Sequence, residues 1–119
     1  MINVYPIKGG YRRGFIVTGH AEYAPHGMDI VCASISAITQ TVVMGLETVA
    51  VIEKNVKNGY MMVEIPNPSD ITDVLIDMMV NGLQHISKQY REYVQVWKDG
   101  HIDEDERVQR GYRTTQSAR

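Results

Sequence analysis

A long apolar segment, residues 30–52 (IVCASISAITQTVVMGLETVAVI), limits the folds open to this chain because it carries one charged side chain, Glu47. Its length and apolar content would suit a membrane span, but its hydroxyl and amide groups would be costly in hydrocarbon unless paired. We expect a helix buried in protein instead, from Asp29 or Ile30 to about Glu53. Because the helix has almost no polar face, a sheet would cover one side and a partner subunit could cover the other.

Two β-rich runs precede this helix. Residues 2–7 and 12–19 are rich in β-branched and aromatic residues and flank Gly9-Gly10, which favours the tight turn of a hairpin. In the second run Phe15 and Val17 would face one side and Ile16 the other.

Further elements follow the apolar helix. An Asn-Gly turn and a strand over 60–65 come next, and Ser69 or Asp70 would cap a second helix that ends near Tyr90. Residues 93–97 (YVQVW) predict a last strand. The apolar stripe expected on the second helix consists of Ile71, Leu75, Met78, Met79, Leu83 and Ile86. The order β-β-α-β-α-β indicates an α+β fold, with two helices packed on a mostly antiparallel sheet.

The length of 119 residues predicts one domain, which we place at residues 1–98. Residues 99–119 have almost no apolar side chains, so we expect a polar, disordered C-terminal tail. The net charge of −2 argues against nucleic acid or an anionic membrane as the main partner. With one cysteine and no signal-peptide pattern at the start, the chain suits a reducing compartment, and we expect a cytoplasmic protein.

The irregular segment 19–32 (GHAEYAPHGMDIVC) joins a histidine to the single cysteine. His20 falls where the second strand ends, and Cys32 falls in the first turn of the expected helix. A helix N-terminus and a neighbouring imidazole both favour the reactive thiolate, so Cys32 and His20 are a candidate nucleophile and base. The N–H groups of the helix start could then stabilise an oxyanion.

Other interpretations of these residues stay open on spacing alone. A cysteine beside Ile30 and Val31 is commonly a small buried hydrophobe, and a histidine at a strand end is commonly structural. A metal site from His20, His26, Asp29 and Cys32 has a spacing unlike the common zinc patterns.

Three further residues are candidates for supporting roles. Asp29 suits the N-cap of the helix. Ser36, one turn beyond Cys32, could bond back to a helix carbonyl or line a site. Gly19 lies just before His20, where it could act as a hinge.

The stretch GHAEYAPHGMDIVCASISA resembles the signature of the Prp family of ribosomal-processing cysteine proteases, approximately G-H-A-x-[YF]-A-x-x-G-x-D-I-V-C-A-x-x-S-A. The resemblance continues in NGYMMVEIP and in GLQHISKQYREYVQV, and covers roughly residues 1–98. It implies that Cys32 is the nucleophile and His20 the base of an endopeptidase with no metal and no cofactor.

The same resemblance implies a homodimer and a protein substrate. Family members remove a short N-terminal extension from a large-subunit ribosomal protein, cutting after a hydrophobic, aromatic-ending motif. The sequence after Ala37 and the polar tail depart from the family pattern, so a phage structural protein is a second candidate substrate. A ribosome- or assembly-associated binding protein without turnover is the alternative from another class.

Overall fold

The computed structural model describes residues 1–9, 12–19 and 28–98, and of residues 28 and 29 the backbone alone. Its elements are β1 (Ile2–Gly9), β2 (Arg12–Thr18), α1 (Met28–Val49), β3 (Glu53–Lys57), β4 (Tyr60–Ile65), α2 (Asp70–Gln89) and β5 (Val94–Val96). The expected tail, residues 99–119, and the 20–27 segment lie outside the described residues. The predicted α+β class, with helices on a mostly antiparallel sheet, is confirmed.

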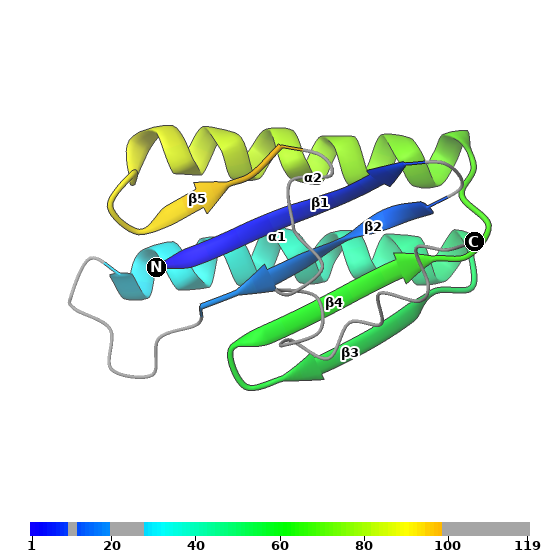
Figure 1. Cartoon of the computed structure of the whole chain (residues 1–119), viewed down its shortest axis with the longest axis horizontal. Coiled ribbons are helices and arrows are strands. Elements are labelled where there is room, and N and C mark those ends of the chain that lie inside the picture. Colours follow the sequence, from blue (N-terminus) through cyan, green and yellow to red (C-terminus); the bar gives the residue numbers. More distant parts are fainter. Residues whose placement is uncertain (10–11, 20–27, 99–119) are drawn as a thin grey trace.

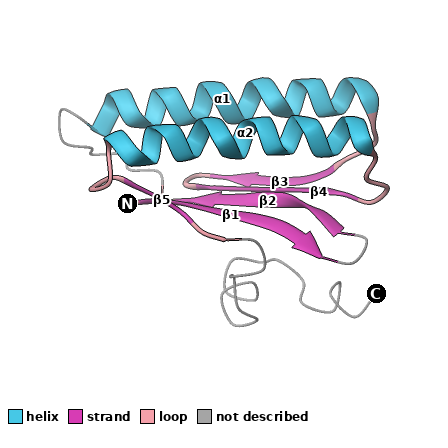
Figure 2. Ribbon diagram, turned by 90° about the horizontal axis from the view of Figure 1, so that it is seen from above, coloured by secondary structure: helices cyan, strands magenta, loops and turns pink. Residues whose placement is uncertain are grey.

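The five strands form one sheet in the order β3-β4-β2-β1-β5. β1 and β2 form the expected antiparallel hairpin, and β2 pairs antiparallel with β4. The last strand, β5, pairs parallel with β1. Both helices lie on one face of this sheet, side by side (Figure 2).

The structure adds a strand that the sequence analysis missed. β3 pairs antiparallel with β4 through the Asn58-Gly59 turn, in which Gly59 has a φ of +74°. The helix α1 ends at Val49, four residues before the expected Glu53, and leaves room for β3. The sequence of β3, EKNVK, lacks an apolar alternation because four of its five residues are exposed at the sheet edge.

The main core lies between the helices and the sheet. Its members include Val31, Ile35 and Leu46 of α1, which pack together with Phe15 and Val63 of the strands. By length and composition, residues 30–49 would also be able to cross a membrane, the one such helix in the described ranges. A core helix passes the same test, and 33% of this span is buried, on the face that packs against the sheet, so the rest of the expected buried helix is partly or fully exposed.

A smaller cluster lies on the opposite face of the sheet. Tyr5, Ile7 and Ile16 are its buried members, and the ring of Trp97 stacks on Tyr5 with centroids 5.9 Å apart. The indole N–H of Trp97 donates to the side-chain oxygen of Asn3 at 3.1 Å. As predicted, therefore, neighbouring residues of β2 alternate between the two faces.

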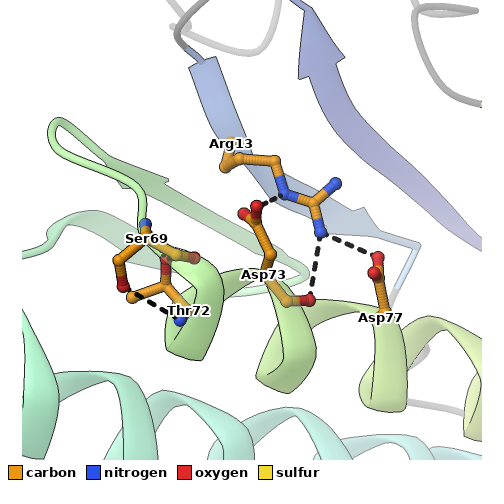
Figure 3. A network of polar contacts seen from close by, with 5 residues as sticks. All are labelled: Arg13, Ser69, Thr72, Asp73 and Asp77. Atoms are coloured by element: carbon orange, nitrogen blue, oxygen red, sulfur yellow. Dashed lines mark hydrogen bonds and ion pairs between the residues drawn. The ribbon is translucent and has the colours of Figure 1, made fainter.

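The second helix begins as its sequence predicts. Ser69 is the N-cap: its hydroxyl accepts a bond from the Thr72 N–H, and the Thr72 hydroxyl accepts one from the Ser69 N–H (Figure 3). The apolar stripe is partly wrong, because Ile71 and Met78 are 59% and 58% exposed. Met79 and Leu83 of the predicted stripe are buried as expected, together with Thr72 and Ile76, which the stripe did not include.

An arginine ties β2 to the start of α2. The Arg13 side chain is 7% exposed, and its Nη2 donates to Asp77 Oδ1 at 2.8 Å and to the Asp73 carbonyl at 3.3 Å (Figure 3). Its Nε lies 3.0 Å from Asp73 Oδ1 as an ion pair. A buried charge is costly unless it is paired. The Arg13 guanidinium must therefore keep its partners on α2, and these contacts fix β2 against α2.

Candidate active site

Four chain segments meet at one end of the molecule: the start of β1, the end of β2, the turn between β3 and β4, and the start of α1 (Figure 1). Between them lies a cavity of about 280 Å³. Its lining residues are Ile2, Val17, Thr18, Cys32, Ile35, Ser36, Thr39, Gln40, Val56, Lys57, Asn58, Gly59, Tyr60 and Met61. The candidate nucleophile therefore faces a space large enough for a substrate side chain.

Cys32 stands on the helix wall of this cavity and is a free, partly exposed thiol. Because α1 begins at Met28, Cys32 is its fifth residue, at the start of the second turn and not in the first as expected. A helical side chain leans over the turn that precedes it, so the sulfur lies toward the helix start, where backbone N–H groups lack partners.

The early helix start also corrects the role expected for Asp29. Asp29 is the second residue of α1 and not its N-cap. A carboxylate in the first turn still interacts favourably with the helix dipole.

Ser36 and Gln40 continue the cavity wall along α1 from Cys32, each four residues further on. Spacing of four residues places side chains on one face of a helix. The Gln40 amide donates to the Ser36 hydroxyl oxygen at 2.8 Å. Of the two roles considered for Ser36, the structure thus favours lining the site.

Gly19 holds the end of β2 in place. Its φ is +95°, and its N–H donates to the carbonyl of Gly59 at 3.1 Å. A Cβ built on Gly19 would lie 1.9 Å from the carbonyl oxygen of Met1. Gly19 is therefore required by close backbone packing, which fixes the point from which the chain continues into His20.

Several predicted site groups lie outside the described part of the chain. His20 and His26 fall in the 20–27 gap, and the side chain of Asp29 is not described, so the dyad stays a prediction. In the described ranges no three His, Cys, Asp or Glu residues cluster as metal ligands would.

Sequence reasoning missed Gln40 and the β3–β4 turn as parts of the site. The four-residue spacing from Cys32 through Ser36 was a usable signal for Gln40. The turn had no such signal, because its place beside α1 follows from the pairing of β4 with β2 far along the chain.

An α+β domain with a partly exposed thiol facing a cavity at a helix start is an arrangement suited to a thiol hydrolase. Comparison with known proteins identifies the family: the model of the cysteine protease Prp family matches residues 1–95, and the chain belongs to that family. It is thus a cysteine protease, a hydrolase of peptide bonds, and the alternative of a binding protein without turnover is set aside.

Individual similar proteins support the assignment to this family. The ribosomal processing cysteine protease Prp of Bacillus subtilis is 30% identical over 91 residues, covering 69% of this chain and 81% of the relative. The ribosomal processing protease Prp of Staphylococcus aureus, solved with a substrate peptide, has a TM-score of 0.70 at 23% identity and covers 82% of this chain and 98% of its own. A protein of Streptococcus mutans has a TM-score of 0.66 at 24% identity, over 81% and 91% of the two chains.

Proposed function

We propose that this protease removes a short N-terminal extension from a large-subunit ribosomal protein in the cytoplasm, with Cys32 as nucleophile and His20 as base. The observation that carries the proposal is the position of Cys32 on the wall of the cavity, at the end of the molecule where β2 leads into His20. The descriptions of the Bacillus and Staphylococcus relatives as ribosomal processing proteases support the substrate class. None of these relatives favours a phage structural protein.

The proposed reaction is acyl transfer. His20 takes the proton of Cys32, and the thiolate attacks the carbonyl carbon of the scissile bond to form a tetrahedral oxyanion. Collapse of the oxyanion breaks the C–N bond, His20 protonates the leaving amine, and a thioester remains on Cys32. Water, deprotonated by His20, then releases the carboxylate product and restores the thiol.

The oxyanion would be stabilised by the start of α1. N–H groups of the first helical turn have no partner within the helix, and this is the turn toward which the Cys32 side chain leans. Preorganised donors of this kind are worth about 3–4 kcal/mol in the transition state.

The cavity fits the cleavage motif that the family resemblance implies. Ile2, Val17, Ile35 and Met61 give it apolar walls, and its volume of about 280 Å³ admits one large side chain. A hydrophobic or aromatic residue next to the scissile bond would be held there by burial.

We also propose that the enzyme is a homodimer through the outer face of its helices. Ile71, Val74 and Met78 of α2 follow one another at helical spacing and are 59%, 63% and 58% exposed. Met44 of α1 is 62% exposed, and it lies toward the end of α1, which is beside the start of α2 (Figure 2). A second copy could cover this helix-face patch, defined as Met44, Ile71, Val74 and Met78.

The substrate proposal is tested with the complete precursor of the large-subunit ribosomal protein that carries an N-terminal extension. Mass spectrometry should show one cut that releases the extension, made by the wild-type enzyme and absent with Cys32→Ala and with His20→Ala. Cleavage of unrelated extended proteins at the same rate would refute the ribosomal substrate, and near-wild-type rates in either variant would refute the dyad.

A further inference from the structure

The outer edge of β3 is a strand edge beside the site. β3 lies at the end of the strand order and pairs with β4 on one side, and no strand in the described ranges pairs with its other side. Such an edge presents a row of backbone donors and acceptors that can pair with an extended peptide.

The register shows which backbone groups of β3 face outward. Lys57 pairs with Tyr60 across the two-residue turn, and Asn55 and Glu53 pair with Met62 and Glu64. In an antiparallel ladder, hydrogen-bonded pairs alternate with non-bonded ones, and the pair that closes a two-residue turn is bonded. The N–H and C=O groups of Lys54 and Val56 therefore point away from β4.

This edge is continuous with the cavity at Cys32. Val56 and Lys57 line the cavity, and the Val56 side chain is 58% exposed although it is apolar. The opposite edge of the sheet, β5, has three residues and contributes none to the cavity lining. A peptide lying along β3 would thus pass the cavity without leaving the edge.

We infer that the substrate binds in an extended conformation as an added strand on the outer edge of β3. Its backbone pairs with Lys54 and Val56, and one side chain enters the cavity beside Cys32. Because side chains of a strand alternate, the residues on either side of the buried one point away from the cavity. This inference rests on the proposed peptidase function and specifies how the site recognises its substrate.

The variant Val56→Pro tests the pairing directly. Proline removes the outward N–H, and an edge strand tolerates it where the N–H makes no ladder bond. The comparison variant Val56→Thr keeps the N–H and changes only the side chain, so its own change in KM measures the contribution of the side chain in the cavity. With a synthetic dodecapeptide that carries the hydrophobic, aromatic-ending motif, Val56→Pro should raise KM about fivefold above that of Val56→Thr, with a melting temperature near wild type.

A second measurement leaves the protein unchanged. The amides of the dodecapeptide are N-methylated one at a time, and cleavage by the wild-type enzyme should fall about fivefold or more at amides two residues apart and little between them. If no position shows this alternation, or if Val56→Pro cleaves like wild type while Cys32→Ala is inactive, the edge inference fails and the peptidase proposal stands. If the wild-type enzyme cleaves neither this peptide nor the ribosomal precursor, both fail.

Discussion

The N–H of Gly19 donates a 3.1 Å hydrogen bond to the carbonyl of Gly59, which joins the end of β2 to the β3–β4 turn. The two glycines have φ values of +95° and +74°. This contact fixes the residue before His20 to the same turn that forms one wall of the cavity at Cys32. The proposed base therefore follows a rigid point of the sheet.

Replacing Gly19 should be severely destabilising. In Gly19→Ala the new Cβ would lie 1.9 Å from the Met1 carbonyl oxygen, at a φ that side chains rarely adopt. We expect a loss of about 2 kcal/mol or more of unfolding free energy, measured by urea denaturation. The control Gly9→Ala, where a Cβ meets nothing within 4 Å, should stay within about 0.5 kcal/mol of wild type. Equal urea midpoints for the two variants would show that close backbone packing does not require a glycine at position 19.

The ion-pair network of Arg13 predicts an order of stabilities. The double variant Asp73→Asn, Asp77→Asn leaves the 7% exposed arginine without an anionic partner. Because the two carboxylates are 45% and 60% exposed, solvent moderates the loss to about 1–3 kcal/mol. Arg13→Met removes the buried charge itself and should cost less. Urea midpoints in the reverse order would show that the network does not hold β2 against α2.

Gln40 should affect catalysis through Ser36. In Gln40→Met the Ser36 hydroxyl loses its 2.8 Å donor and is free to bond back to a helix carbonyl, away from the site. We expect kcat/KM to fall about three- to tenfold, and the same change to have no effect in a Ser36→Ala background. Gln84→Met, on an exposed residue away from the cavity, is the control. If the losses in kcat/KM of the two single variants add up in the double variant, Gln40 does not act through Ser36.

The helix-face patch predicts the oligomeric state. A glutamate at Val74 would place a charge in the centre of the proposed dimer interface, so Val74→Glu should sediment as a monomer under conditions in which the wild type is a dimer. Gln84→Glu adds the same charge on α2 outside the patch and should remain dimeric. A wild-type enzyme that sediments as a monomer at all concentrations would contradict this interface.

The sequence predicted the parts of the fold that depend on local patterns. Ser69, one of the two expected N-cap residues, caps α2, and Gly9-Gly10 marked the first hairpin. β3 was missed because an exposed edge strand such as EKNVK needs no apolar alternation. Ile71 and Met78 matched a helical apolar stripe although they are exposed, because periodicity does not tell which of two faces meets the sheet.

The site was predictable only in part for a similar reason. Cys32 and Ser36 followed from the motif and from helical spacing, and both line the cavity. Val56 and Lys57 reach the same cavity through strand pairing between segments distant in sequence, which no local pattern encodes.

In the proposed mechanism Cys32, activated by His20, forms a thioester with the substrate. A single turnover of the ribosomal precursor, quenched in acid and analysed by mass spectrometry, tests this most directly. We predict an acyl adduct on the peptide that contains Cys32, which forms much more slowly in His20→Ala and disappears as product carboxylate is released. Cleavage at the wild-type rate by Cys32→Ala, or turnover with no adduct on Cys32 at any time, would rule out Cys32 as the nucleophile.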